Sequence, residues 1–220
     1  MGRRSSHTPD QLRELIITSA SDLVIDHGLV GLSAREIARK VGYSPGTIYN
    51  VFRDLDDLIF TIETRMLDRL AAQIAALPPN PDPSKRIAAL AHLYLQFSLE
   101  KPRIWNLLME HVPASRVDLP LEFKQRIDAV INAVETVVAP LVDFDKLRAR
   151  RITAVLWADL HGISTLATAQ KLSHVTSEEA AALVDDFVAM YTAGIHFETP
   201  PEPQVAAPRP KKRVPAKLHD

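Results

Sequence analysis

The chain of 220 residues is long enough for one or two domains with a substantial hydrophobic core. Its composition, 46% hydrophobic and 24% charged with no cysteine, is that of an ordinary globular protein and excludes disulfides and thiolate chemistry. No segment approaches the roughly 20 uninterrupted apolar residues of a membrane helix, and no signal-like apolar run follows the basic N-terminus. We therefore expect a soluble, cytoplasmic protein with no membrane partner.

The formal net charge of −1 is unevenly distributed along the chain. Residues 1–53 contain seven Lys/Arg and five Asp/Glu, and residues 209–220 contain five and one. The segment between them is acidic and would repel phosphate, so any attraction to nucleic acid is expected near the two ends. An asymmetry of this size also arises by chance in proteins that never bind DNA.

The spacing of apolar residues, three and four apart, together with scarce glycine, predicts an all-α fold of about nine helices. Ser33 and Ser44 can cap the free amides of two short helices, Ser33 in a capping box with Glu36. Gly42 ends the first of these helices, and Asp54 can cap a longer one. The first three helices are expected at about 9–27, 33–42 and 44–52, and a longer fourth one begins near Asp54 and includes Leu70.

Four prolines between residues 78 and 83 interrupt the chain, and five further helices are predicted beyond them. The first of them begins near Asp82 and includes Phe97, and the others are expected at about 102–112, 120–138, 145–171 and 177–197. Residues 199–220 are Pro-rich and then basic, cannot build a core, and are expected to be disordered. Three roles stay open for this tail: an inert terminus, additional nonspecific DNA affinity, and recruitment of a partner.

Two short helices joined by a tight glycine turn, after a longer helix, form a helix-turn-helix candidate. The second helix must present small and polar groups to base edges while its other side packs on the scaffold. Ile48 and Phe52 suit the packed side. Short capped helices also pack in proteins that never meet DNA, so this pattern alone leaves the function open. Suited to the outer side are Pro45, Gly46, Thr47, Tyr49 and Asn50.

Residues 32–60, LSAREIARKVGYSPGTIYNVFRDLDDLIF, closely resemble the helix-turn-helix of TetR-family regulators. The resemblance implies a three-helix DNA-binding domain (1–54) followed by a helical ligand-binding and dimerisation bundle (55–198). It also implies a homodimer that places two recognition helices on a palindromic operator in double-stranded DNA. The DNA contacts are expected to come from Ser33, Arg35, Ser44, Pro45, Gly46, Thr47, Tyr49, Asn50 and Arg53.

Two positions depart from that family's pattern. Many relatives have an aromatic residue or histidine where this chain has Val51, and many have lysine where it has Leu55. A basic phosphate contact common in the family is therefore missing, and Arg53 is the candidate substitute.

The segment from Trp157 to Gly162 resembles the Trp…His-Gly signature of one TetR-type C-terminal domain, and residues 93–111 resemble the same domain. Trp157 and His161 lie four residues apart and share one helix face. His161 fits either a hydrogen-bonded core histidine or a ligand contact. The aromatic residues and methionine of this body could equally form plain core or line an apolar pocket. The ligand-binding candidates are Phe97, Trp105, Met109, Phe123, Trp157 and His161.

The last two predicted helices each have a broad apolar face. Alone, these faces could simply fill the monomer, but the family resemblance favours a four-helix interface between two copies. The interface candidates are Ile152, Val155, Leu156, Ile163, Leu183, Phe187, Val188 and Tyr191.

The function expected from the sequence is that of a ligand-responsive repressor, released from its operator by a small, apolar effector. An activator, or an architectural DNA-binding protein without ligand control, is the alternative. A helical enzyme has no support, because the chain shows no nucleophile elbow, phosphate loop or paired carboxylates. Neither a cofactor nor a metal site is expected, since the histidines lack metal-ligand spacing.

Overall fold

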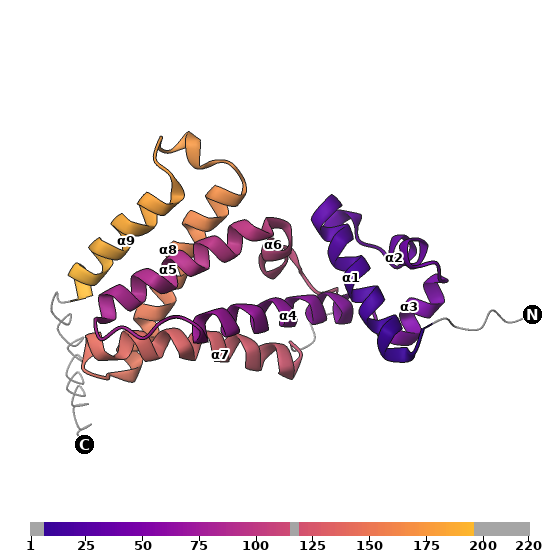
Figure 1. Cartoon of the computed structure of the whole chain (residues 1–220), viewed down its shortest axis with the longest axis horizontal. Coiled ribbons are helices and arrows are strands. Elements are labelled where there is room, and N and C mark those ends of the chain that lie inside the picture. Colours follow the sequence, from indigo (N-terminus) through magenta and orange to yellow (C-terminus); the bar gives the residue numbers. More distant parts are fainter. Residues whose placement is uncertain (1–6, 115–118, 196–220) are drawn as a thin grey trace, which may run out of the picture.

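The computed structural model describes residues 7–114 and 119–195, which form nine α-helices and no β-strand (Figure 1). The all-α prediction is confirmed. Single 3₁₀ turns occur at Leu29–Gly31, Ala139–Val142 and Leu172–His174. The basic tail predicted at 199–220 lies outside the described residues. The helices are α1 (Pro9–His27), α2 (Ala34–Val41), α3 (Pro45–Val51), α4 (Leu55–Ala75), α5 (Pro83–Glu100), α6 (Pro102–Glu110), α7 (Leu121–Val138), α8 (Lys146–Thr168) and α9 (Ala180–Ile195).

Local capping determines where the N-terminal helices begin. The side-chain oxygens of Ser33, Ser44 and Asp54 each accept a hydrogen bond from the backbone amide three residues later, at 3.1, 3.3 and 2.7 Å. Such bonds satisfy amides that a helix leaves without intrahelical partners. Only half of the capping box predicted at Ser33 is present, because the Glu36 carboxylate accepts two N–H bonds from Arg39 instead.

Two helix ends in the body differ from the predicted ones. α8 stops at Thr168 rather than near 171, because Gln170 takes a left-handed conformation with φ of 56°. α9 begins at Ala180 rather than near 177, because the amide of Glu178 bonds to the hydroxyl of Thr176 in a turn (3.1 Å). Side chain-to-backbone bonds of this kind compete with the helix.

Gly42 forms the turn of the helix-turn-helix. It lies in the left-handed region, with φ of 75° and ψ of 27°, and ends α2 by donating its amide to the Ala38 carbonyl. This conformation is disfavoured for residues with a Cβ atom.

Replacing Gly42 with alanine is expected to lower the free energy of unfolding by about 1–2 kcal/mol. A Cβ at this position would have no atom within 4 Å, so the loss would be conformational rather than steric. Chemical denaturation of both proteins measures it. Gly46→Ala serves as the comparison, because this glycine lies inside α3 without a positive φ and there alanine should be neutral or stabilising. Equal destabilisation by both substitutions would contradict the role of the left-handed turn.

The packing of α1–α3 continues without a break into the rest of the molecule. In Figure 1 these helices lie at one end, and α4 runs from them along α7. One hydrophobic cluster contains Ile16 of α1 and Ile48 of α3 together with Ile104, Trp105 and Leu107 of α6. A domain boundary at 54/55, as proposed from the sequence, therefore does not separate two independent cores.

A second core fills the body. α5 packs against α7, α8 and α9, with Ile87, Val138 and Val184 fully buried. Two candidate interface residues, Leu156 and Val188, belong to this core and are only 2% and 6% exposed. In residues 7–114 and 119–195, no helix combines the length and apolar composition that a bilayer crossing requires.

Candidate functional site

The outward side of α3 is the first candidate site. Ile48 and Phe52 are each 1% exposed and hold α3 on the scaffold, whereas Tyr49 is 51% exposed. Pro45, Gly46 and Asn50 are also exposed. This short helix buries one side and exposes a tyrosine, an asparagine and the small residues Pro-Gly at its start. It therefore has the shape needed to enter a major groove.

An arginine of α1 fixes the C-terminal end of α3. The guanidinium of Arg13 lies 4.3 Å from the ring centroid of Phe52 and donates to the carbonyl of Val51 at 3.3 Å. Cation–π contact and a charge-assisted bond thus tie α3 to the supporting helix. The sequence showed no sign of this link, because Arg13 and Val51 lie 38 positions apart.

Serines at both helix starts combine capping with candidate DNA contacts. Ser44 Oγ lies 3.0 Å from Thr47 Oγ1, so the two hydroxyls share a hydrogen bond at the start of α3. Ser44 is exposed and Thr47 half-buried. Free amides and the dipole at a helix N-terminus favour phosphate. Ser33 is half-buried at the start of α2, and Arg35 is exposed two residues beyond it.

The cations around α2 and α3 differ in how they are paired. Arg39 pairs with Glu36 at 2.6 Å, and Lys40 with Asp22 at 3.0 Å. Such exposed pairs contribute little to stability and exchange readily for phosphate. Arg35 has no ion pair within the described part of the chain, which makes it the most available cation of this group.

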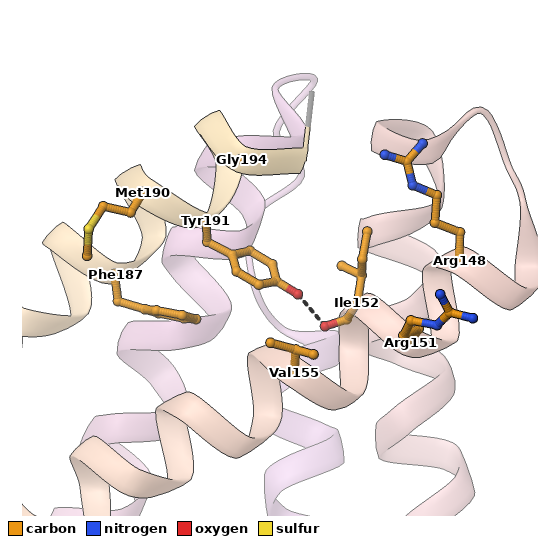
Figure 2. A pocket seen from close by; sticks show the side chains of 8 residues that line it. All are labelled: Arg148, Arg151, Ile152, Val155, Phe187, Met190, Tyr191 and Gly194. Carbon is orange, nitrogen blue, oxygen red and sulfur yellow. Dashed lines mark hydrogen bonds between the residues drawn. The ribbon is translucent and has the colours of Figure 1, made fainter. Parts of the chain in front are cut away.

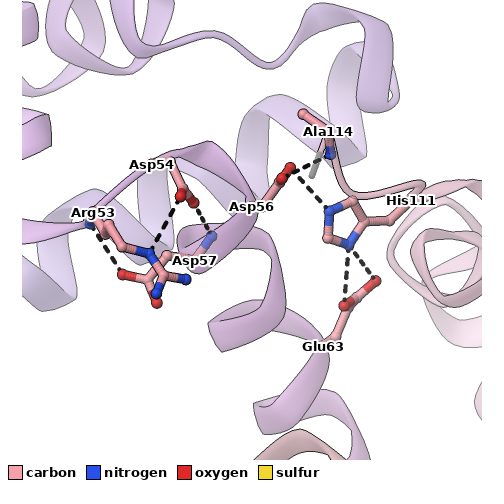
Figure 3. Close-up of polar contacts among 7 residues, drawn as sticks. All are labelled: Arg53, Asp54, Asp56, Asp57, Glu63, His111 and Ala114. Carbon is pink, nitrogen blue, oxygen red and sulfur yellow. Dashed lines mark hydrogen bonds and ion pairs between the residues drawn. The ribbon is translucent and has the colours of Figure 1, made fainter. Parts of the chain in front are cut away.

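Arg53, the candidate substitute phosphate contact, lies beside the acidic start of α4 (Figure 3). Its Nε is 3.3 Å from the Asp54 carboxylate, and its backbone amide donates to Asp57 at 3.1 Å. The Arg53 side chain is 75% exposed and can still reach outward. The neighbouring carboxylates nevertheless offset its positive charge, which a count of charges along the sequence did not show.

Comparison with protein families identifies both halves of the chain. Residues 16–62 match the model of bacterial regulatory proteins of the tetR family, and residues 87–191 match the tetracyclin repressor-like C-terminal domain. The chain belongs to the TetR family of transcriptional regulators. The Trp-His-Gly type of C-terminal domain stays a prediction.

Two curated relatives agree with this assignment. The chain is 24% identical over 158 residues to the transcriptional activator FasR of Mycolicibacterium smegmatis, covering 71% of this chain and 72% of that one. It is 22% identical over 107 residues to the uncharacterised HTH-type regulator YobS of Bacillus subtilis, covering 49% of this chain. That match spans 56% of the YobS length, just over half.

Solved structures show the same fold. A Rhodococcus sp. RHA1 protein of unknown function matches with a TM-score of 0.68 and 24% identity, covering 88% of this chain and 98% of that one. FadR from Bacillus subtilis, solved in complex with stearoyl-CoA, matches with a TM-score of 0.59 and 15% identity over 83% of this chain and 99% of its own.

Inside the body of this TetR-family protein, Tyr94 of α5 belongs to a chain of five aromatic rings in contact with one another. The Tyr94 hydroxyl is 3.0 Å from His161 Nδ1, and the Trp105 ring stands perpendicular to Tyr94 at 4.8 Å. Trp157 stacks on His161 at 5.3 Å, and Phe97 packs edge-on against Trp105 at 5.8 Å. The structure thus brings four ligand-binding candidates together and adds Tyr94. We call these five residues the aromatic cluster: Tyr94, Phe97, Trp105, Trp157 and His161.

Hydrogen bonding in the aromatic cluster follows from burial. Burial raises the pKa of the Tyr94 phenol and lowers the pKa of the His161 imidazole. The phenol therefore keeps its proton and the imidazole stays neutral. In this state the Tyr94 hydroxyl donates the hydrogen bond and His161 Nδ1 accepts it. In contrast, the indole N–H of Trp105 is buried with no hydrogen-bond partner in the described structure.

The other two ligand-binding candidates lie elsewhere. Met109 is 49% exposed on α6. Phe123 packs against Phe60 at 5.2 Å in a small separate cluster. A hollow of about 450 Å³ does adjoin the aromatic cluster, because Phe97 lines it together with residues of α4 and α5 such as Gln73 and Gln96.

An open hollow of about 420 Å³ lies between α8 and α9 (Figure 2). Ile152, Val155, Phe187 and Met190 give it an apolar floor. Tyr191 donates a hydrogen bond to the Ile152 carbonyl, which ties the two helices together, and burial raises the pKa of this tyrosine to about 12. Four interface candidates therefore lie around one exposed apolar depression.

The remaining interface candidates do not line this hollow. Leu156 and Val188 lie in the protomer core, and Ile163 and Leu183 are half-buried, Ile163 against the same core. Four of the eight predicted residues thus line the hollow, although Ile152, Phe187 and Tyr191 among them also pack partly against the core. Leu156 and Val188 belong to the protomer core itself.

Proposed function

We propose that this protein is a ligand-responsive repressor rather than an enzyme, and that it binds a palindromic operator as a homodimer. The observation that carries the proposal is the exposed Tyr49 on an α3 helix whose other side is buried through Ile48 and Phe52. An exposed tyrosine on a rigid helix offers a hydroxyl to phosphate and a flat ring to the groove wall. The family match over residues 16–62 supports this role.

The direct test uses the purified protein and the DNA upstream of its own gene. At one fixed salt concentration, a footprint over a near-palindrome in the presence of scrambled competitor would support the proposal. Equal binding to upstream DNA and to scrambled DNA would contradict specific recognition.

We place the effector site at the aromatic cluster and the adjoining hollow. A buried N–H without an acceptor is unfavourable by about 1–3 kcal/mol. A ligand with a carbonyl or carboxylate oxygen would satisfy Trp105 while its apolar part packs among the rings. The FadR structure with stearoyl-CoA makes a long acyl chain the first ligand class to test.

α6 connects this site to the DNA-binding helices. Trp105 lies in its first half, and Arg103, two residues earlier, donates to the backbone carbonyls of Ile25 (2.9 Å) and Asp26 at the end of α1. A ligand that displaces Trp105 would move Arg103 and so tilt α1 with its attached α3. Two recognition helices must be spaced by about 34 Å on adjacent major grooves, so a small tilt weakens operator binding.

Trp105→Phe is expected to weaken effector binding by about two- to tenfold while leaving operator affinity unchanged in the absence of ligand. The substitution keeps an aromatic ring in the core but removes the indole N–H together with part of the ring volume, and the bond of that N–H to a ligand oxygen is worth about 0.5–1.5 kcal/mol. Stearoyl-CoA and stearate are the first probes, followed by a library, with thermal stabilisation as the readout.

Phe144→Leu is the control, because Phe144 is 71% exposed and lies outside the aromatic cluster. If Trp105→Phe and the unaltered protein respond equally to the ligand, the proposal that the effector binds at this site is wrong. If no library compound stabilises the protein, the architectural alternative without ligand control is favoured.

The relative FasR is an activator, which keeps activation as the second candidate. A reporter gene driven by the footprinted promoter distinguishes the two in a strain lacking the regulator. Reporter expression that rises in this strain supports repression, and expression that falls supports activation.

A further inference from the structure

A buried charged cluster joins the start of α4 to the end of α6 (Figure 3). Its members are His111, Glu63 and Asp56, whose side chains are 4%, 2% and 24% exposed. His111 Nδ1 is 3.3 Å from both carboxylate oxygens of Glu63, and Nε2 is 3.3 Å from Asp56 Oδ1. One imidazole therefore bridges two carboxylates that lie two turns apart on α4.

Neighbouring elements enclose this cluster. The Phe60 ring contacts His111 edge-on at 4.8 Å, and the Ala114 amide donates to the second oxygen of Asp56 at 2.9 Å. From α7, Phe123 packs on Phe60 and closes that side with an apolar ring. The imidazole is therefore shielded from water by aromatic groups and anchored by carboxylates.

The other charged groups near the cluster are either paired with other residues or at least partly exposed at the surface. Arg126 of α7 pairs with Asp68 at 2.5 Å and lies 3.9 Å from Glu122. On α4, Asp57 accepts from the backbone amide of Arg53. The remaining charged residues at these helix ends are Asp54, which caps α4 and pairs with Arg53, Glu110 of α6, which is exposed, and Lys124 of α7.

Electrostatics favours the protonated imidazole at this place. Burial alone disfavours the imidazolium, but the hydrogen bonds and charges of Glu63 and Asp56 outweigh it and raise the pKa of His111 above 6.5. Burial also raises the pKa of Glu63, which shows that its charge is unfavourable without a counter-ion. Loss of the imidazole proton would leave two carboxylates against one neutral ring.

We propose that His111 is a positioning residue whose proton holds the first two turns of α4 against the end of α6. α3 ends at Val51 and α4 begins at Leu55, so a shift of these turns reaches the recognition helix directly. To this extent the inference rests on the proposed DNA-binding function. It adds a response to pH that needs no effector.

The direction of the pH effect follows from the raised pKa of His111. A histidine whose pKa is higher in the folded than in the unfolded protein stabilises the fold. This stabilisation is complete when the pH is below the pKa of the unfolded state, and it is lost as the pH rises through the pKa of the folded state. Operator binding should therefore be tighter at about pH 6.5 than at about pH 8.5, by about fivefold or more.

The first measurement uses the full chain without DNA. An NMR titration of the imidazole signals should show His111 losing its proton above the ordinary value of about 6.5. Hydrogen exchange, corrected for intrinsic pH dependence, should show the amides of residues 55–63 losing protection over the same range. A His111 that titrates at or below its ordinary pKa, or unchanged protection of α4, would overturn the proposal even if no operator were found.

The second measurement compares operator affinity at about pH 6.5, 7.5 and 8.5 for three variants. His111→Gln should flatten the pH dependence, and Glu63→Gln should move its midpoint to lower pH because one negative neighbour is gone. His174→Gln, an exposed histidine in the turn before α9, should behave like the unaltered protein. Thermal melts confirm that each variant is folded. A His111→Gln protein that keeps the full pH dependence would exclude His111 as its origin.

Discussion

Replacing Tyr49 with alanine is expected to weaken specific operator binding by more than an order of magnitude. The side chain is half-exposed on α3 and makes no contribution to the core, whereas its neighbours Ile48 and Phe52 are buried. A specific side-chain contact with DNA is worth about 1–3 kcal/mol, and a dimer would lose two of them. The expected loss in affinity is therefore roughly thirtyfold or more, at unchanged thermal stability.

The measurement is an anisotropy titration on footprinted operator at fixed salt, with scrambled DNA as competitor. Tyr49→Phe separates the two parts of the side chain: it should retain binding if the ring is the main contact and lose part of it if the hydroxyl binds phosphate. Unchanged operator affinity of Tyr49→Ala would refute α3 as the recognition helix.

A carboxylate on the outer face of α8 is expected to split the proposed dimer. Val155 and Met190 are 48% and 69% exposed at the hollow between α8 and α9 (Figure 2). Contiguous apolar surface of this kind is typical of interaction sites, and we propose a second copy of the chain as its occupant. Val155→Asp would bury an unpaired charge in that interface.

Size-exclusion chromatography with light scattering should show Val155→Asp as a monomer. Its operator affinity should fall by about 10²–10⁴-fold, because the two half-sites are no longer bound by linked subunits. Leu121→Asp is the matched control, since Leu121 is 71% exposed at the start of α7. A Val155→Asp dimer with full operator affinity, or an unaltered protein that is monomeric, would refute the interface.

The burial of Leu156 and Val188 refines this interface. Both were expected to contact the partner, yet they pack in the protomer core. Met190 was not among the expected residues, although it is well exposed beside the hollow. The apolar stripe of a helix predicts which side is buried. A helix that packs on the protomer core on one side and on a second copy of the chain on the other divides its apolar residues between these two surfaces.

Helix positions in the N-terminal part of this protein follow from the sequence alone. The caps at Ser33, Ser44 and Asp54 act over three residues, so their bonds need no tertiary partner. The same holds for the glycine turn at Gly42 and for the family motif of residues 32–60, which is contiguous in the chain. Interactions between near neighbours in the chain can be predicted from the order of the residues.

Contacts between distant helices were decided only by the tertiary structure. Glu63 and His111 lie 48 positions apart, and Tyr94 and His161 lie 67 apart. Neither Glu63 nor its pairing with His111 was singled out from the sequence. Met109 and Phe123 lie away from the aromatic cluster for the same reason. Helical spacing determines which side of a helix is apolar, whereas the crossing angles and rotations of the packed helices determine which residues that side contacts.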